Sequence, residues 1–221
     1  MDNAKDGFGY DSMAFFGRVN ASISHELKNV MAIVSETAGL LGDLADMASS
    51  ENPISPAMLK DCTDSIMEEI QRGFFVIRQM NRFSHSIDKP AESVNLPDVI
   101  DLAINLAGYL RSAGKAILNT REGAAFTVQT CPFLLQAIVY QTLVYAYTNA
   151  GSSVQVSISI LPQPGAAYRI IFSGFNMSGF QVFPDPAIQS MAAVIGVTIN
   201  CDRAADQLEL DVPPAMEAAG R

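Results

Sequence analysis

The stretch SHELKN, residues 24–29, brings together side chains that could carry out nucleophilic and acid–base chemistry. His25 is one of only two histidines in the 221-residue chain. A neutral, exposed imidazole can act as a nucleophile, and a neighbouring carboxylate such as that of Glu26 can fix its tautomer or take its proton. Asn29, one helical turn further on, could orient a phosphoryl oxygen or a water molecule. These three residues form a candidate catalytic site.

The helical neighbours of His25 are small or polar. On a helix they lie three and four residues away, and they are Ala21, Ser22, Lys28 and Asn29. This environment favours an exposed histidine over one packed in a core, and it marks Ala21, Ser22 and Lys28 as a surface on which a partner could dock. An ordinary solvated histidine would have the same neighbours, so the spacing alone leaves both interpretations open.

A long amphipathic helix is predicted over residues 13–48. With Phe16 at the first heptad position, most residues on one broad face are apolar, which is typical of a helix in a bundle. Glu26 interrupts this face, and a carboxylate there is costly unless it is hydrated or used. The position of Glu26 therefore favours the functional interpretation of His25.

A second helix is predicted from Pro56 to about Ser86. Ser55 before Pro56 is typical of a helix start, because proline fits the first helical position. The apolar stripe of this helix consists of Leu59, Ile66, Ile70, Phe74, Ile77, Met80 and Phe83. The two helices and the short loop between them form a helical hairpin, with His85 near its end as a surface or capping residue.

A hairpin by itself leaves half of each apolar stripe in water. Two copies would bury these faces in a four-helix bundle, so we expect a homodimer through residues 13–88. The alternative is that the stripes pack against the C-terminal half of the chain.

The second half of the chain mixes helical and strand patterns. Helices are predicted over residues 97–113, 132–147 and 185–195, and strands over 153–160, 167–173, 197–200 and 207–212. With helices on one face of the sheet, this is an α+β sandwich. The predicted organisation is a tail over 1–12, the hairpin over 13–90, the α/β domain over 91–214 and a tail over 215–221.

Composition limits the partners and the compartment. The formal net charge is −9, which argues against nucleic-acid binding by phosphate neutralisation. No stretch approaches the ~18 apolar residues that span a bilayer, and the polar N-terminus has no apolar run typical of a signal peptide. Cys62, Cys131 and Cys201 are far apart and lack metal-ligand spacing. We therefore expect reduced, mostly buried thiols in a cytoplasmic protein without a metal or other cofactor.

Residues 15–41, FFGRVNASISHELKNVMAIVSETAGLL, resemble the H-box of two-component sensor histidine kinases. The family signature is His-Glu-Leu, then Lys or Arg, then Asn or Thr, usually followed by proline; residues 25–29 match in order, and Val30 departs. The resemblance implies that His25 is the phosphoacceptor and Glu26 the acid–base residue beside it. Asn29 falls where the family places a residue used in dephosphorylating the partner. The hairpin then resembles the family's dimerisation and phosphotransfer domain.

The resemblance fails at the position of the family's N-box, a helix ending roughly Asn-Leu-x-x-Asn-Ala whose asparagines hold magnesium and phosphates. Aligned on Ala146, the two asparagine positions hold Gln141 and Tyr145. Tyr145 cannot supply an amide oxygen to a metal ion, and magnesium demands near-ideal oxygen geometry. Asn149 falls four residues beyond the second expected asparagine.

The family's glycine box, Asp-x-Gly-x-Gly, is also degraded. After the strand that ends near residue 172, Gly174 and Gly179 survive as a trace, but Ser173 and its neighbours supply no acid for the adenine amine. The ATP lid and the second glycine box are missing. We expect an ATPase-like (GHKL) fold that does not bind ATP, with Phe175, Phe180 and Phe183 collapsed into the degenerate nucleotide site.

A hairpin with an intact phosphoacceptor pattern and a degenerate ATPase-like domain resembles the dimeric histidine phosphotransferases of bacterial phosphorelays. The resemblance implies that His25 exchanges phosphoryl groups with the aspartates of response-regulator receiver domains, without ATP. Two alternatives stay open: a divergent ATP-dependent kinase, and a non-catalytic scaffold that kept the kinase fold.

Overall fold

The computed structural model describes residues 2–49, 53–110, 114–120, 126–150, 155–177 and 182–216. These residues form two compact units, one of Asn20–Asn81 and the other of Met1–Val19 with Arg82–Arg221. Both boundaries fall inside helices, because α1 spans Asp2–Met47 and α2 spans Pro56–His85. The first unit therefore holds the middle and the tip of a hairpin whose two ends belong to the second unit.

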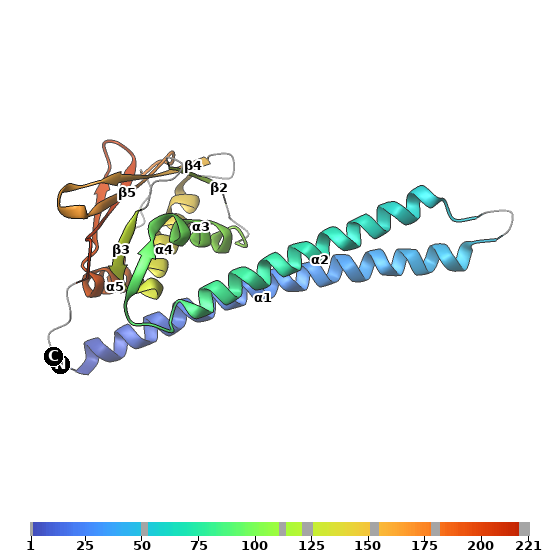
Figure 1. The fold of residues 1–221 in the computed structure, drawn as a ribbon, viewed down its shortest axis with the longest axis horizontal. Coiled ribbons are helices and arrows are strands. Elements are labelled where there is room, and N and C mark those ends of the chain that lie inside the picture. The colour runs from blue at the N-terminus through green and yellow to red at the C-terminus, as the bar shows by residue number, and fades with distance from the viewer. Residues whose placement is uncertain are drawn as a thin grey trace. The chain divides into compact units, whose positions relative to one another are not determined.

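In the hairpin unit, α1 and α2 run antiparallel to each other (Figure 1). Their contact buries Ile23 and Val30 of α1 and Val76 of α2, each no more than 1% exposed. The helices approach closely at Gly73, where an added Cβ would lie 3.2 Å from Cγ1 of Val30. Ile23 and Val30 belong to the apolar face predicted for the first helix. Val76 does not belong to the stripe predicted for the second helix, whose Phe74 and Ile77 are 53% and 38% exposed.

The helix bounds confirm one prediction and correct another. The second helix begins at Pro56 as predicted. The first begins at Asp2 and not at residue 13, so residues 2–12 are helical and do not form the predicted tail. Glycines at positions 7 and 9 weaken the helical pattern, but adding turns to an existing helix needs no new nucleus.

The other unit contains a mixed five-stranded sheet. Its strands, in spatial order, are β2 (Lys115–Asn119), β4 (Gln155–Pro162), β5 (Tyr168–Ser173), β7 (Gln207–Val212) and β6 (Thr198–Asp202). β2 and β4 are parallel and the remaining neighbours are antiparallel, including the predicted hairpin of β4 and β5. A 3₁₀ turn, Pro164–Ala166, joins the hairpin strands. A second, two-stranded sheet pairs β1 (Glu92–Asn95) with β3 (Thr127–Thr130).

Three helices lie on one face of the five-stranded sheet (Figure 1): α3 (Leu96–Ala107), α4 (Pro132–Ala150) and α5 (Pro186–Ile195). The register places Ile158 opposite Phe172, and Phe172 opposite Leu208, and all three are fully buried on the helical face. α4 is buried almost all round, as its apolar pattern predicts. The α+β class predicted from the sequence is confirmed.

An aromatic cluster ties the ends of the hairpin helices to α4 within this unit. The Phe15 ring of α1 has its centroid 5.6 Å from those of Phe83 and Phe133 and 5.5 Å from that of Tyr140. Phe83 of α2 also stacks on Phe16 at 5.3 Å. Directly before Phe83 in the chain, Arg82 reaches Asp101 of α3 at 3.2 Å. The segment of α1 around Phe15 and the last turn of α2 are therefore part of the core of the α/β unit.

Several predicted elements differ in extent. α3 ends at Ala107 and not near residue 113, and β1, β2 and β3 were not predicted. The tail predicted over residues 215–221 is bound to β3 at its start, because Gln129 exchanges backbone hydrogen bonds with Pro214 and Met216, at 2.8 Å each. Among the described residues, no helix combines the length and apolarity needed to cross a membrane.

Candidate functional site

His25 projects from the exposed side of α1, as its neighbours predict. The nearest polar group is the side-chain amide of Asn29, whose Nδ2 lies 3.3 Å from Nδ1 of the imidazole. The two residues are four apart on the helix, which places their side chains one above the other. The pattern read from the sequence therefore brings His25 and Asn29 into contact.

The Asn29 amide controls which ring nitrogen of His25 is free. When Nδ2 of Asn29 donates to Nδ1, the ring proton lies on Nε2. When the amide turns over and its oxygen accepts from Nδ1–H, the lone pair lies on Nε2, the outer nitrogen of the ring. Asn29 can thus select the tautomer that makes Nε2 a nucleophile.

Glu26 does not contact the imidazole directly. Its Oε2 accepts from Nδ2 of Asn29 at 3.4 Å, and its Oε1 forms an ion pair with Nη2 of Arg72 at 3.1 Å. Arg72 lies on α2 and also pairs with Glu69 at 2.8 Å. The carboxylate that interrupts the apolar face is therefore paired, which removes most of the cost of its partial burial.

Arg72 and Glu69 are the residues around Glu26 that the sequence analysis missed. Their spacing of three on α2 indicates a charge pair within that helix. Nothing in the sequence pairs Arg72 with Glu26, because that contact depends on the register between two helices.

The predicted docking residues lie beside His25 on the same helix. Ala21 and Lys28 are exposed, and Ser22 is half-buried. The side chains are short except for that of Lys28, so they leave the imidazole open to an approaching surface. Docking by a receiver domain at these residues stays a prediction.

In the α/β unit, the residue that aligns with the second N-box asparagine is Tyr145, and it is part of an aromatic stack. Tyr145 of α4 is only 8% exposed, and its ring lies 4.7 Å from that of Phe183 with an interplanar angle of 30°. Burial is the main cause that raises the pKa of the Tyr145 hydroxyl. Asn149 does not replace the missing amide, because its Nδ2 donates to the backbone oxygen of Tyr145 at 2.8 Å. Gln141, at the first N-box position, is half-buried one turn earlier.

The residues that align with the family's glycine box, beginning at Ser173, lie among buried apolar side chains. Ser173 ends β5, and its hydroxyl is directed to the backbone oxygen of Ser157 on the neighbouring strand. Gly174 has a φ of 87°, and an added Cβ would lie 2.6 Å from the backbone oxygen of Gln155, so a structural close approach explains this glycine. Phe175 and Met177 are buried next to it. Gly179, together with Phe180, lies outside the described residues.

Other predicted features have simpler roles. His85 lies at the end of α2, where its Nδ1 contacts Asp88 at 2.7 Å.

The three cysteines differ in burial. Cys62 is buried and Cys131 half-buried. Cys201 is exposed, contrary to the prediction of mostly buried thiols, because it lies on the edge strand β6. Its thiol donates to the backbone oxygen of Phe183 at 3.3 Å. Within the described ranges, His, Cys, Asp and Glu side chains form no group of three that could hold a metal ion.

No protein-family model and no curated protein sequence matches the chain. A solved structure described as a bacterial phosphotransferase matches 90% of this chain and 95% of its own, with 11% sequence identity and a TM-score of 0.51. The histidine kinase AdeS of Acinetobacter baumannii matches 86% of this chain and 98% of its own, with 9% identity and a TM-score of 0.45. The catalytic domain of the histidine kinase ThkA matches 58% of this chain and 100% of its own, with 13% identity and a TM-score of 0.46.

The match to the structure described as a phosphotransferase extends over most of both chains, so the two share a fold. This shared fold agrees with the fold that the sequence resemblance implies.

Proposed function

We propose that this protein is a dimeric histidine phosphotransfer protein of a two-component phosphorelay, in which His25 exchanges phosphoryl groups with receiver-domain aspartates without using ATP. The observation that carries the proposal is the exposed imidazole of His25 with the Asn29 amide 3.3 Å from Nδ1 and Glu26 beside it. Such a group needs only an in-line donor and an open face to react.

The transfer step balances without a further reactant. Once the Asn29 amide has turned so that its oxygen accepts from Nδ1–H, the Nε2 lone pair of His25 attacks the phosphorus of an aspartyl phosphate, and the bond from phosphorus to the aspartate oxygen breaks. The aspartate leaves as a carboxylate, and the phosphoryl group stays on Nε2 while the ring proton remains on Nδ1. The receiver's own metal ion and lysine would supply the charge stabilisation.

The aromatic stack at the degenerate nucleotide site supports transfer without ATP. Tyr145, which aligns with the second asparagine of the family's N-box, stacks on Phe183 and cannot supply the amide oxygen that the family uses for magnesium. Displacing the stack would expose two aromatic rings and still provide no amide oxygen for the metal.

We expect the wild-type protein to show no phosphohistidine after incubation with γ-labelled ATP and magnesium, but to be phosphorylated at His25 by phosphoramidate, a small-molecule donor to histidines. The phosphorylated protein should then pass its label to receiver domains. A Tyr145→Ala, Phe183→Ala double variant is a matched control, since opening the stack without supplying an amide oxygen should not restore ATP labelling. Label from ATP on wild-type His25 would refute transfer without ATP and make the protein a kinase.

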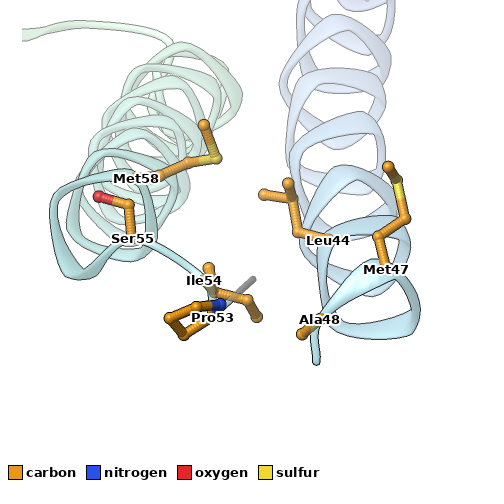
Figure 2. Close-up of a pocket in the computed structure, with 7 residues that line it drawn as sticks. All are labelled: Leu44, Met47, Ala48, Pro53, Ile54, Ser55 and Met58. Atoms are coloured by element: carbon orange, nitrogen blue, oxygen red, sulfur yellow. The ribbon is translucent and has the colours of Figure 1, made fainter. Parts of the chain in front are cut away.

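The homodimer is supported by the apolar residues that the hairpin unit exposes. On α2 these include Met67, Phe74, Phe75 and Ile77, with Phe74 53% exposed. At the hairpin tip, Figure 2 shows Leu44 and Met47 of α1 on one side of an opening and Met58 of α2 on the other. A second hairpin would cover these side chains in a four-helix bundle.

Replacing Phe74 with glutamate should therefore weaken the dimer by at least about tenfold in dissociation constant, because two-fold symmetry buries the new carboxylate twice. Sedimentation equilibrium over a concentration series measures the change. Ser93→Glu adds the same charge at an exposed position of β1 and should leave the dimer intact. A wild-type protein that stays monomeric at micromolar concentration would rule out the homodimer.

A further inference from the structure

Arg72 joins the two helices of the hairpin at the level of His25. Its guanidinium lies 3.1 Å from Oε1 of Glu26 on α1 and 2.8 Å from Oε1 of Glu69 on α2. The arginine side chain is 37% exposed, and the two carboxylates are 20% and 14% exposed. One cation therefore holds two partly buried carboxylates together.

The contacts continue from Arg72 to the imidazole. The second oxygen of Glu26 accepts from the Asn29 amide at 3.4 Å, and the same amide nitrogen lies 3.3 Å from Nδ1 of His25. An arginine on one helix is thus connected through a carboxylate and an amide to the ring on the other. Each contact restricts the orientation of the next group.

We propose that Arg72 is a positioning residue of the His25 site. It fixes the Glu26 carboxylate and through it the Asn29 amide, whose Nδ2 then faces Nδ1 of His25 and keeps the ring proton on Nε2 until the amide turns over. This inference rests on the proposed phosphotransfer at His25. Without Arg72, the carboxylate of Glu26 would lose its partner on α2 and could rotate toward water or toward the imidazole. The Asn29 amide would then lose the acceptor that sets its orientation.

A purely structural role fits the contacts less well. A partly exposed ion pair contributes little to stability because solvent screens it. The cluster also leaves Nε of Arg72 and Oε2 of Glu69 buried, and no described residue supplies a hydrogen-bond partner for either atom. A network built only to hold the helices together would satisfy these atoms. The arrangement is better explained by the need to place the Glu26 carboxylate.

The test measures the tautomer of the His25 imidazole and the rate of its phosphorylation separately. Nitrogen-15 spectra of the imidazoles report the tautomer, and His85 provides an internal reference as the only other histidine. Phosphoramidate provides a defined donor, so the maximal rate at His25 and the half-saturating donor concentration can be determined for each variant. The variants are Arg72→Gln, Arg72→Lys, Glu26→Gln and the Arg72→Gln, Glu26→Gln double variant. Arg78→Gln is the control, since Arg78 lies on the same helix over the Phe75 ring.

We expect Arg72→Gln to shift the His25 nitrogen signals toward the tautomer protonated on Nδ1 and to raise the maximal rate about tenfold, with the half-saturating concentration changed less than about twofold. Arg72→Lys, which keeps the charge but not the two-nitrogen contacts of the guanidinium, should lie between Arg72→Gln and wild type. In the Glu26→Gln background, Arg72→Gln should have no further effect. Arg78→Gln should behave as wild type.

Two results would overturn the inference: unchanged His25 signals in folded Arg72→Gln, or an equal change of rate with and without Glu26. If Arg72→Gln does not fold by circular dichroism, Arg72→Lys decides the question through the same signals and rate. Failure of the proposed function would look different. In that case wild-type His25 would not exchange phosphate with receiver domains, while the imidazole spectra would still report on Arg72.

Discussion

Replacing His25 with glutamine should reduce phosphohistidine formation to below about a thousandth of the wild-type rate, because it removes the attacking nitrogen. Glutamine keeps a polar side chain of similar length on an exposed helical face, so the fold should not change. The measurement is acid-labile phosphate after reaction with phosphoramidate and, separately, with a phosphorylated receiver domain.

His85→Gln is the matched control for this substitution. His85 is 76% exposed and contacts Asp88. We expect this variant to keep wild-type transfer to and from receiver domains. Label that persists in His25→Gln and disappears in His85→Gln would show that His85, and not His25, is the phosphoacceptor, and would refute the proposed function.

Replacing Phe83 with alanine should lower the free energy of unfolding by about 3–5 kcal/mol, the range for deleting a fully buried phenylalanine side chain. Phe83 has no exposed surface and its ring contacts those of Phe15, Phe16 and Phe133. The cavity would lie where the last turn of α2 meets α1 and α4. Chemical denaturation at one fixed protein concentration measures the loss, since the stability of a dimer depends on concentration.

Tyr10→Ala tests whether the effect is specific to the buried cluster. Tyr10 lies on α1 in the same unit and is 74% exposed. Its removal should change the free energy of unfolding by less than about 0.5 kcal/mol. Equal losses in the two variants would mean that the aromatic cluster does not contribute to the core as its burial indicates.

The elements that could be predicted from the sequence are those with strong local signals. Pro56 marks the start of α2, and Asp185 caps α5 by accepting from the backbone N–H of Ile188 at 2.8 Å. The alternation in β4 is clear from Gln155 to Ile160. By contrast, β1, β2 and β3 are four or five residues long and depend on partners far along the chain, so local pattern does not define them.

The candidate site likewise combines contacts that the sequence predicts with contacts that depend on the folded chain. His25, Glu26 and Asn29 lie on one helix, so their spacing alone places them together. The contact between Arg72 and Glu26 requires the register of α2 against α1, which the apolar stripes do not specify to one residue. The stack of Tyr145 on Phe183 joins α4 to the segment before α5 and likewise depends on the folded chain. The sequence indicated which N-box asparagines are missing, and the structure adds the aromatic stack of Tyr145 on Phe183.

The aromatic cluster has a consequence for modular exchange of the two halves of this chain. A cut at residue 90 would separate Phe133 and Tyr140 of α4 from Phe15 and Phe83 on the hairpin. A hairpin recombined from another protein would have to bring rings that fit the same surface of α4. The proposed docking of a receiver domain would therefore change by substitution along the exposed face around His25 more readily than by exchange of the whole hairpin.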